Sequence, residues 1–113
     1  MLITGSLWLV WHLPLLALGY GFPEHPLQGA LLMSVHLMIS AFTLAYLRER
    51  SSAFAAGLFH GTNEAFVLLA LAPIAGGTPL TVGVASLSWL AASLIIAVAL
   101  FAYDRLIAAD SIT

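Results

Sequence analysis

The sequence predicts an all-α fold, namely a polytopic membrane helix bundle of four transmembrane helices. Three observations predict it: 62% of the 113 residues are hydrophobic, only 7% are charged, and the mean hydropathy is +1.07. A soluble domain carries about 25% charged residues, so this composition excludes a water-soluble globule, and it equally excludes a disordered chain. β-strands are excluded because long apolar runs without alternation would leave backbone groups unpaired in lipid.

Four charge-poor stretches define the predicted helices within a single membrane domain over residues 1–113. Each stretch is close to or above the roughly 20 residues with which a helix crosses the hydrocarbon core. Three of the stretches contain no Asp, Glu, Lys or Arg, and the third along the chain contains Glu64 alone. The predicted helices cover residues 2–20, 27–47, 53–73 and 79–103, and residues 104–113 form a short tail.

The breaks between these stretches carry helix-start signals. Proline is tolerated in the first turn of a helix, where its missing N–H has no partner to lose, and Pro26 and Pro79 fit that position. Serine and threonine hydroxyls accept hydrogen bonds from the free N–H groups of a first turn. Ser51, Ser52 and Thr78 are therefore the predicted caps of the third and fourth helices.

The arginines predict the orientation. Arg48 and Arg50 lie between the second and third helices and Arg105 lies in the tail, so all of them fall on one side of a four-span bundle. The positive-inside rule makes that side cytoplasmic. We therefore expect an integral protein of the cell (plasma) membrane, in contact with membrane lipid, with its N-terminus and C-terminus in the cytoplasm. Three basic residues and a net charge of −2 exclude a nucleic-acid partner.

Polar side chains inside the predicted helices are the candidate functional residues. Ionisable groups are costly in a membrane and usually face the bundle interior. Counted at about 1.5 Å per residue from the cytoplasmic ends, they reach similar depths on three helices, which permits a shared site. Asn63 and Glu64 are also the (i, i+3) and (i, i+4) neighbours of His60 on one helix face. The candidates are His12, His36, His60, Asn63 and Glu64.

Two of these histidines stand in sequence motifs. Trp8 precedes His12 by four positions and Leu-Pro follows, while His60 opens the segment His-Gly-Thr-Asn-Glu. In this order the segments resemble the second and third motifs of the CPBP intramembrane proteases, also called the CAAX-protease and bacteriocin-processing or Abi family. Those motifs are an aromatic residue, three residues and His, commonly followed by Leu-Pro, and then His, three residues and Asn. The resemblance covers about residues 2–70.

The resemblance implies a membrane metalloendopeptidase, a hydrolase that cleaves membrane-associated peptides or proteins. It assigns His12 and His60 to catalysis and to the binding of a divalent metal such as zinc. Glu64 would join this catalytic site either as a third metal ligand or as a group that orients one of the histidines. Three protein ligands and a water are the usual catalytic zinc arrangement. The metal makes the water nucleophilic, and a carboxylate takes up its proton. Trp8, Asn63 and His36 would support this site.

The chain departs from the family pattern at two points. Glu64 occupies the position where the family usually has Asn, and Asn63 lies one position early. The first family motif, a Glu-Glu pair followed three residues later by Arg, is absent, because the sequence contains no Glu-Glu pair. In the family this glutamate is thought to activate the water. We therefore expect a chain that is inactive alone, either N-terminally truncated, which we favour because both histidines remain, or degenerate.

Other functions stay open. A non-catalytic membrane immunity or assembly protein needs none of the catalytic groups. A small four-helix transporter fits the length and the one carboxylate inside the helices, Glu64, although such transporters carry theirs in the first helix. A haem-binding bundle would use His12 with His60 or His36 as axial ligands. For His36, hydrogen bonding to Ser40 or to a neighbouring helix is a sufficient role.

Overall fold

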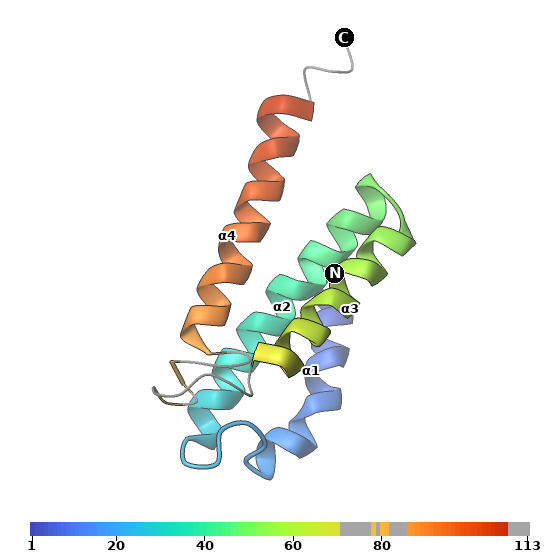
Figure 1. Cartoon of the computed structure of the whole chain (residues 1–113). Helices are drawn as coiled ribbons and strands as arrows, with labels where there is room; N and C mark the ends of the chain where they lie inside the picture. Colours follow the sequence, from blue (N-terminus) through green and yellow to red (C-terminus); the bar gives the residue numbers. More distant parts are fainter. Residues whose placement is uncertain (71–77, 79, 82–85, 109–113) are drawn as a thin grey trace.

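The structure, a computed structural model, describes residues 1–70, 78, 80, 81 and 86–108. Within these ranges it contains helices and no strand, which confirms the all-α class. The helices are α1 (Leu2–Ala17), α2 (Pro26–Arg50), α3 (Ala53–Ala70) and α4 (Leu87–Tyr103), and α4 continues into a short π-helix, η1 (Asp104–Ala108) (Figure 1).

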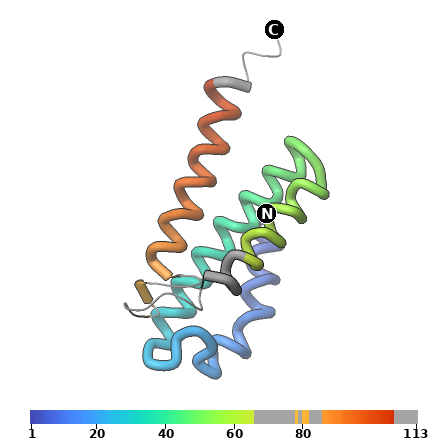
Figure 2. Tube along the Cα trace, viewed as in Figure 1, coloured from blue at the N-terminus to red at the C-terminus, as the bar shows by residue number. Residues whose placement is uncertain are grey.

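Helix α2 is the centre of the fold. Helices α1, α3 and α4 each pack against it, whereas in the described ranges no Cα atom of α1 lies within 8 Å of one in α3. Short turns make α1 and α3 antiparallel to α2, as the trace in Figure 2 shows. Helix α4 runs parallel to α2, because Ser93 lies beside His36 and Asp104 beside Arg50.

The end of α1 is set by a glycine. Helix α1 ends at Ala17 and not at residue 20 as predicted, because Gly19 adopts φ +78°, a left-handed conformation that glycine takes without strain. The N–H groups of Gly19 and Tyr20 donate to the carbonyls of Leu16 (2.9 Å) and Leu15 (3.0 Å). This pair of bonds is a Schellman motif, which satisfies the last carbonyls of the helix.

Two other glycines allow close contact with α2. Phe22, in the turn after α1, is 3% exposed and lies on Gly29, where a Cβ atom would overlap the Phe22 side chain. At Gly5 of α1, a Cβ atom would lie 2.7 Å from Sδ of Met38 and 3.3 Å from Cβ of Ala41. Small residues let membrane helices approach closely, so glycine at these positions holds α1 and its turn against α2.

Helices α2 and α3 begin close to the predicted positions. Helix α2 starts at Pro26, which lies in its first turn as predicted. The Ser52 hydroxyl accepts a hydrogen bond from the Ala55 N–H (3.1 Å), which confirms Ser52 as a cap of α3. Helix α2 ends at Arg50 and not at residue 47, because basic side chains interact favourably with the negative end of a helix dipole. Residues 71–73 of the predicted third helix lie outside the described residues.

The predicted start of the fourth helix is wrong. Helix α4 begins at Leu87 and not at residue 79, and residues 80 and 81 lie in a turn. Thr78, the predicted cap, is instead bonded to Thr81, whose Oγ1 accepts from the Thr78 N–H (3.0 Å). The cap is Ser86, whose hydroxyl accepts from the Trp89 N–H. Side chains that bond to nearby backbone groups offer an alternative to the helix, which accounts for the late start.

The predicted fourth helix and the predicted tail both contain residues that the structure leaves undescribed. Pro79 lies outside the described residues, and so do residues 109–113 of the predicted tail. The first part of that tail is ordered into η1.

Two helical segments are long and apolar enough to cross a membrane: α2, with 25 residues, and Leu87–Leu106, with 20. The described core is small, and large apolar side chains lie on the surface, for example Trp11 at 78% and Ile95 at 69% exposed. Exposed apolar surface of this kind marks contact with a membrane, another protein or a ligand. The core consists of Leu16, Phe22, Leu37 and Ala41.

Candidate functional site

His12 lies inside α1, one turn after Trp8. Its Nδ1 atom is 2.8 Å from the carbonyl oxygen of Trp8. A carbonyl oxygen can only accept a hydrogen bond, so the Nδ1–H group donates, and in the neutral ring Nε2 keeps its lone pair. Nε2 of the half-buried His12 is therefore the nitrogen that can accept a proton or bind a ligand.

Trp8 connects His12 to His60 on α3. The His60 and Trp8 rings meet edge to face, with centroids 5.4 Å apart and planes at 71°. The His12 ring is 6.4 Å from the Trp8 ring and tilted by 58°. We call Trp8, His12 and His60 the indole–imidazole cluster. The structure thus brings together the three residues that stand at the motif positions of the first and third helices.

The structure does not add Glu64 to this cluster. Glu64 and Asn63 lie about one turn beyond His60 on α3, with Glu64 exposed and Asn63 half-buried. In the ranges described, neither side chain makes a hydrogen bond or an ion pair. Because of the (i, i+4) spacing, Glu64 lies on the same face of α3 as His60. However, the backbones of α1 and α3 are not in contact. The long indole of Trp8 bridges this gap, whereas a carboxylate reaches less far.

The cluster does not fit the predicted zinc centre. Among the described residues, no three His, Cys, Asp or Glu side chains lie close enough together to hold a metal ion. Two imidazoles give fewer ligands than the three that a catalytic zinc usually has. The ligand set His12, His60 and Glu64 is therefore not assembled in this part of the chain, and the chemistry of the cluster is that of its own side chains.

His36 belongs to a different place, the contact between α2 and α4. It is 7% exposed, with Ser40 Oγ 3.4 Å from Nε2 and Ser93 Oγ 3.5 Å from Nδ1. These distances are at the long, weak end of hydrogen bonding. The Trp89 ring lies edge to face with the imidazole, at 6.4 Å between centroids. His36 therefore joins two helices, which agrees with the hydrogen-bonding role expected from the sequence. It is not part of the indole–imidazole cluster.

Sequence reasoning missed the α4 side of this contact. Ser93 is a polar residue in an otherwise apolar stretch of α4, and this was the available signal. Two further connections between α2 and α4 carry no such signal: Tyr46 Oη donates to the Leu100 carbonyl (3.2 Å), and Arg50 pairs with Asp104 (2.6 Å). Their partners are fixed only when the two helices are placed side by side.

Comparison of the chain with family models, with curated proteins and with solved structures finds no match. The resemblance to the CPBP proteases therefore depends on the motif residues and stays a prediction.

Proposed function

We propose that this protein is a four-span integral membrane protein whose indole–imidazole cluster is the histidine part of a CPBP-type intramembrane endopeptidase site. One observation supports the proposal above all. Trp8 and His12 of α1 and His60 of α3 match two motifs that are far apart in the sequence, and the Trp8 ring lies beside both imidazoles. Residues so far apart meet only when the fold brings their helices together.

The membrane part of the proposal is supported by the packing. Helices α1 and α3 have 16 and 18 residues and pack against α2, which is long enough to cross a bilayer. At about 1.5 Å per residue the two shorter helices cover most of the roughly 30 Å core. The ion pair of Arg50 with Asp104 supports a common side for Arg48, Arg50 and Arg105, which the positive-inside rule makes cytoplasmic.

The cluster suits the binding and polarisation of a peptide bond. Nε2 of His12 can accept a proton from a water molecule or a hydrogen bond from a peptide N–H. The His60 ring can donate a hydrogen bond to a carbonyl oxygen on which negative charge develops. Trp8 touches both rings and keeps them in place. Because the surrounding helix faces are apolar, the substrate is a membrane-associated peptide or protein.

A complete hydrolytic cycle needs one more group. When His12 takes a proton, the resulting imidazolium is stabilised by a carboxylate, as in other imidazole-based hydrolases. Among the described residues no carboxylate makes a hydrogen bond or an ion pair with the cluster. A second function is therefore favoured by the same observation: a non-catalytic membrane immunity or assembly protein would use the cluster to bind a peptide without cleaving it.

The test measures binding at the cluster. The full chain is reconstituted in phosphatidylcholine vesicles with a membrane-anchored peptide that carries a photoreactive diazirine, and the cross-linked segments are identified by mass spectrometry. We expect cross-links to α1 and α3 that are lost in His12→Ala and His60→Ala. They should persist in His25→Ala, because His25 is exposed in the turn before α2. Equal cross-linking in all three variants would contradict the proposal.

A further inference from the structure

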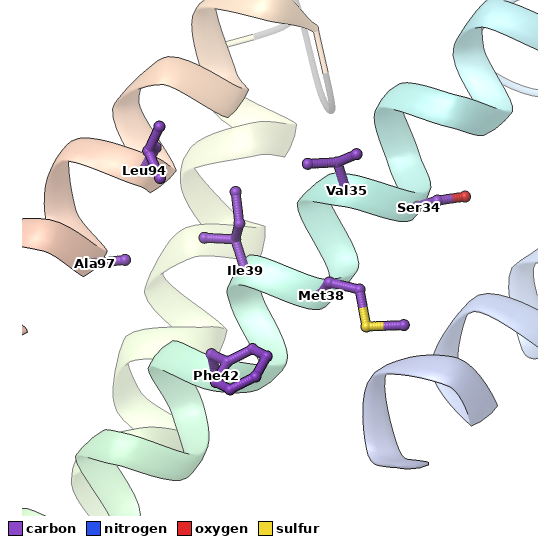
Figure 3. A pocket seen from close by; sticks show the side chains of 7 residues that line it. All are labelled: Ser34, Val35, Met38, Ile39, Phe42, Leu94 and Ala97. Atoms are coloured by element: carbon purple, nitrogen blue, oxygen red, sulfur yellow. The ribbon is translucent and has the colours of Figure 1, made fainter. Parts of the chain in front are cut away.

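An apolar groove runs between α2 and α4. Its volume is about 440 Å³, within the range of sites that bind small molecules. Leu94 and Ala97 of α4 lie across it from Val35, Ile39 and Phe42 of α2 (Figure 3). Val35 and Phe42 are 48% and 45% exposed, so the floor of the groove is open to the surroundings.

The groove offers hydrocarbon contact and no free polar group. Ser34 is the polar residue in its lining, and its hydroxyl donates to the Ala30 carbonyl of its own helix (2.6 Å). An unpaired polar ligand group would lose its hydrogen bonds with water on entering such a site. The lining therefore suits an aliphatic chain.

Polar contacts join α2 and α4 beyond one end of the groove. One turn after Phe42, the Tyr46 hydroxyl donates to the Leu100 carbonyl (3.2 Å), and one turn further Arg50 pairs with Asp104 (2.6 Å). These contacts hold α2 and α4 together where the apolar part of both helices ends. In a membrane, this end lies at the level of the lipid headgroups.

Arg105 is a cation at this end without an acidic partner in the described part of the chain. The neighbouring Asp104 is bound to Arg50, and its side chain is only 12% exposed. The Arg105 guanidinium instead lies over the Phe101 ring, 5.1 Å from its centroid. Phe101 follows Ala97 by one helical turn, so Arg105 continues the row of residues that lines the groove on α4.

We propose that the groove binds an acyl chain of an anionic phospholipid, whose phosphate contacts Arg105. The proposal rests on the membrane placement proposed above and is independent of peptide hydrolysis. The occupant follows from charge complementarity: the planar guanidinium suits phosphate oxygens, and basic residues beside a membrane helix attract the anionic lipids of the cytoplasmic leaflet. A neutral phospholipid would keep the chain contact and gain less at Arg105.

Native mass spectrometry of the full chain in detergent tests the site. The protein is mixed with equal amounts of dioleoyl phosphatidylglycerol and dioleoyl phosphatidylcholine. We expect about a fivefold preference for phosphatidylglycerol, equivalent to about 1 kcal/mol for one basic side chain near an anionic lipid. Arg105→Ala should remove the preference, and Val35→Trp, which fills the open floor, should weaken the binding of both lipids.

Arg48→Ala is the matched control. It removes the same charge at the same end of the fold. Arg48 lies on α2, however, two positions from Arg50, so it projects from the other side of that helix and the preference should persist. Equal binding of the two lipids by the unmodified chain overturns the proposal, as does a preference that survives in Arg105→Ala. A dimer that forms through this face and excludes lipid also overturns it.

Flotation separates this proposal from the membrane placement. A chain that floats with vesicles after an alkaline wash, yet binds both lipids equally, overturns the lipid site alone. A chain that stays out of the vesicles overturns the site and the membrane placement together. Circular dichroism monitors the helix content of each variant. Arg105→Ala, a change at an exposed position of η1, decides the matter if Val35→Trp misfolds.

Discussion

Trp8 and His60 make an edge-to-face contact, with ring centroids 5.4 Å apart, between two helices whose Cα atoms stay more than 8 Å apart in the described residues. The contact therefore depends on the size of the indole and not on close packing of α1 with α3. Aromatic pairs of this geometry contribute about 0.5–1.5 kcal/mol beyond the area that they bury. Trp8 thus gives α1 and α3 a direct ring contact in addition to the packing of each helix on α2.

The first prediction concerns the separation of α1 and α3 at Trp8 and His60. Because the chain contains no cysteine, Trp8→Cys combined with His60→Cys gives one thiol pair on a clean background. We expect no direct disulfide on oxidation, since a disulfide needs Cα atoms within about 7 Å. A short bifunctional thiol reagent should bridge the pair, which gel mobility after cleavage between the helices would reveal.

The control for this pair is Val10→Cys with His60→Cys. Val10 is 59% exposed and lies two positions from both Trp8 and His12, which places it on the other side of α1, so the same reagent should leave this pair unbridged. Spontaneous disulfide formation between positions 8 and 60 would mean that α1 and α3 pack directly, contrary to the structure.

The second prediction concerns Gly29. A Cβ atom at this position would overlap the buried Phe22 side chain, so Gly29→Ala forces the turn after α1 away from α2. Overpacking of this kind costs about 1–3 kcal/mol, and we expect a lower melting temperature in detergent, measured by circular dichroism. Gly57→Ala is the matched control, because a Cβ atom there meets nothing within 4 Å. If both variants melt alike, Phe22 does not pack on Gly29.

The sequence predicts the helices better than their starts. The charge-poor stretch and Pro26 predict α2, and the hydroxyl at Ser52 caps α3 as expected. The predicted start of α4 is wrong because Thr78 and Ser86 carry the same signal, a hydroxyl ahead of an apolar run. Thr81 decides between them by bonding to Thr78, a local competition that helix propensity does not reveal.

The sequence predicts which side chains lie at the same depth in the bundle, but not how far apart their helices are. Motif spacing and depth bring Trp8, His12 and His60 together, because these depend on helical rise and order along the chain. The same reasoning fails for Glu64, because a position on the same helix face as His60 does not determine how closely α3 approaches α1. That separation is set by how each helix packs on α2, which no local pattern contains.

The third prediction concerns orientation. Glu24 and Ser51 are exposed in turns at opposite ends of α2, so Glu24→Cys and Ser51→Cys report on opposite sides of the membrane. With the arginines in the cytoplasm, a membrane-impermeant maleimide added to intact cells should label Glu24→Cys only. Labelling of Ser51→Cys after cell lysis provides the control for reactivity. Labelling of Ser51→Cys alone in intact cells would reverse the orientation.

The last prediction concerns catalysis by this chain. No carboxylate makes a hydrogen bond or an ion pair with the indole–imidazole cluster in the described residues, and the sequence contains no Glu-Glu pair. A histidine that must take a proton without a carboxylate partner is a poor base for peptide hydrolysis. We therefore expect the purified chain to leave a membrane-anchored fluorogenic peptide uncut while still cross-linking to it. Cleavage that is lost in His12→Ala and Glu64→Gln, but kept in Glu24→Gln, would contradict this expectation. It would identify Glu64 as the missing base, brought to the cluster by a movement of α3 towards α1.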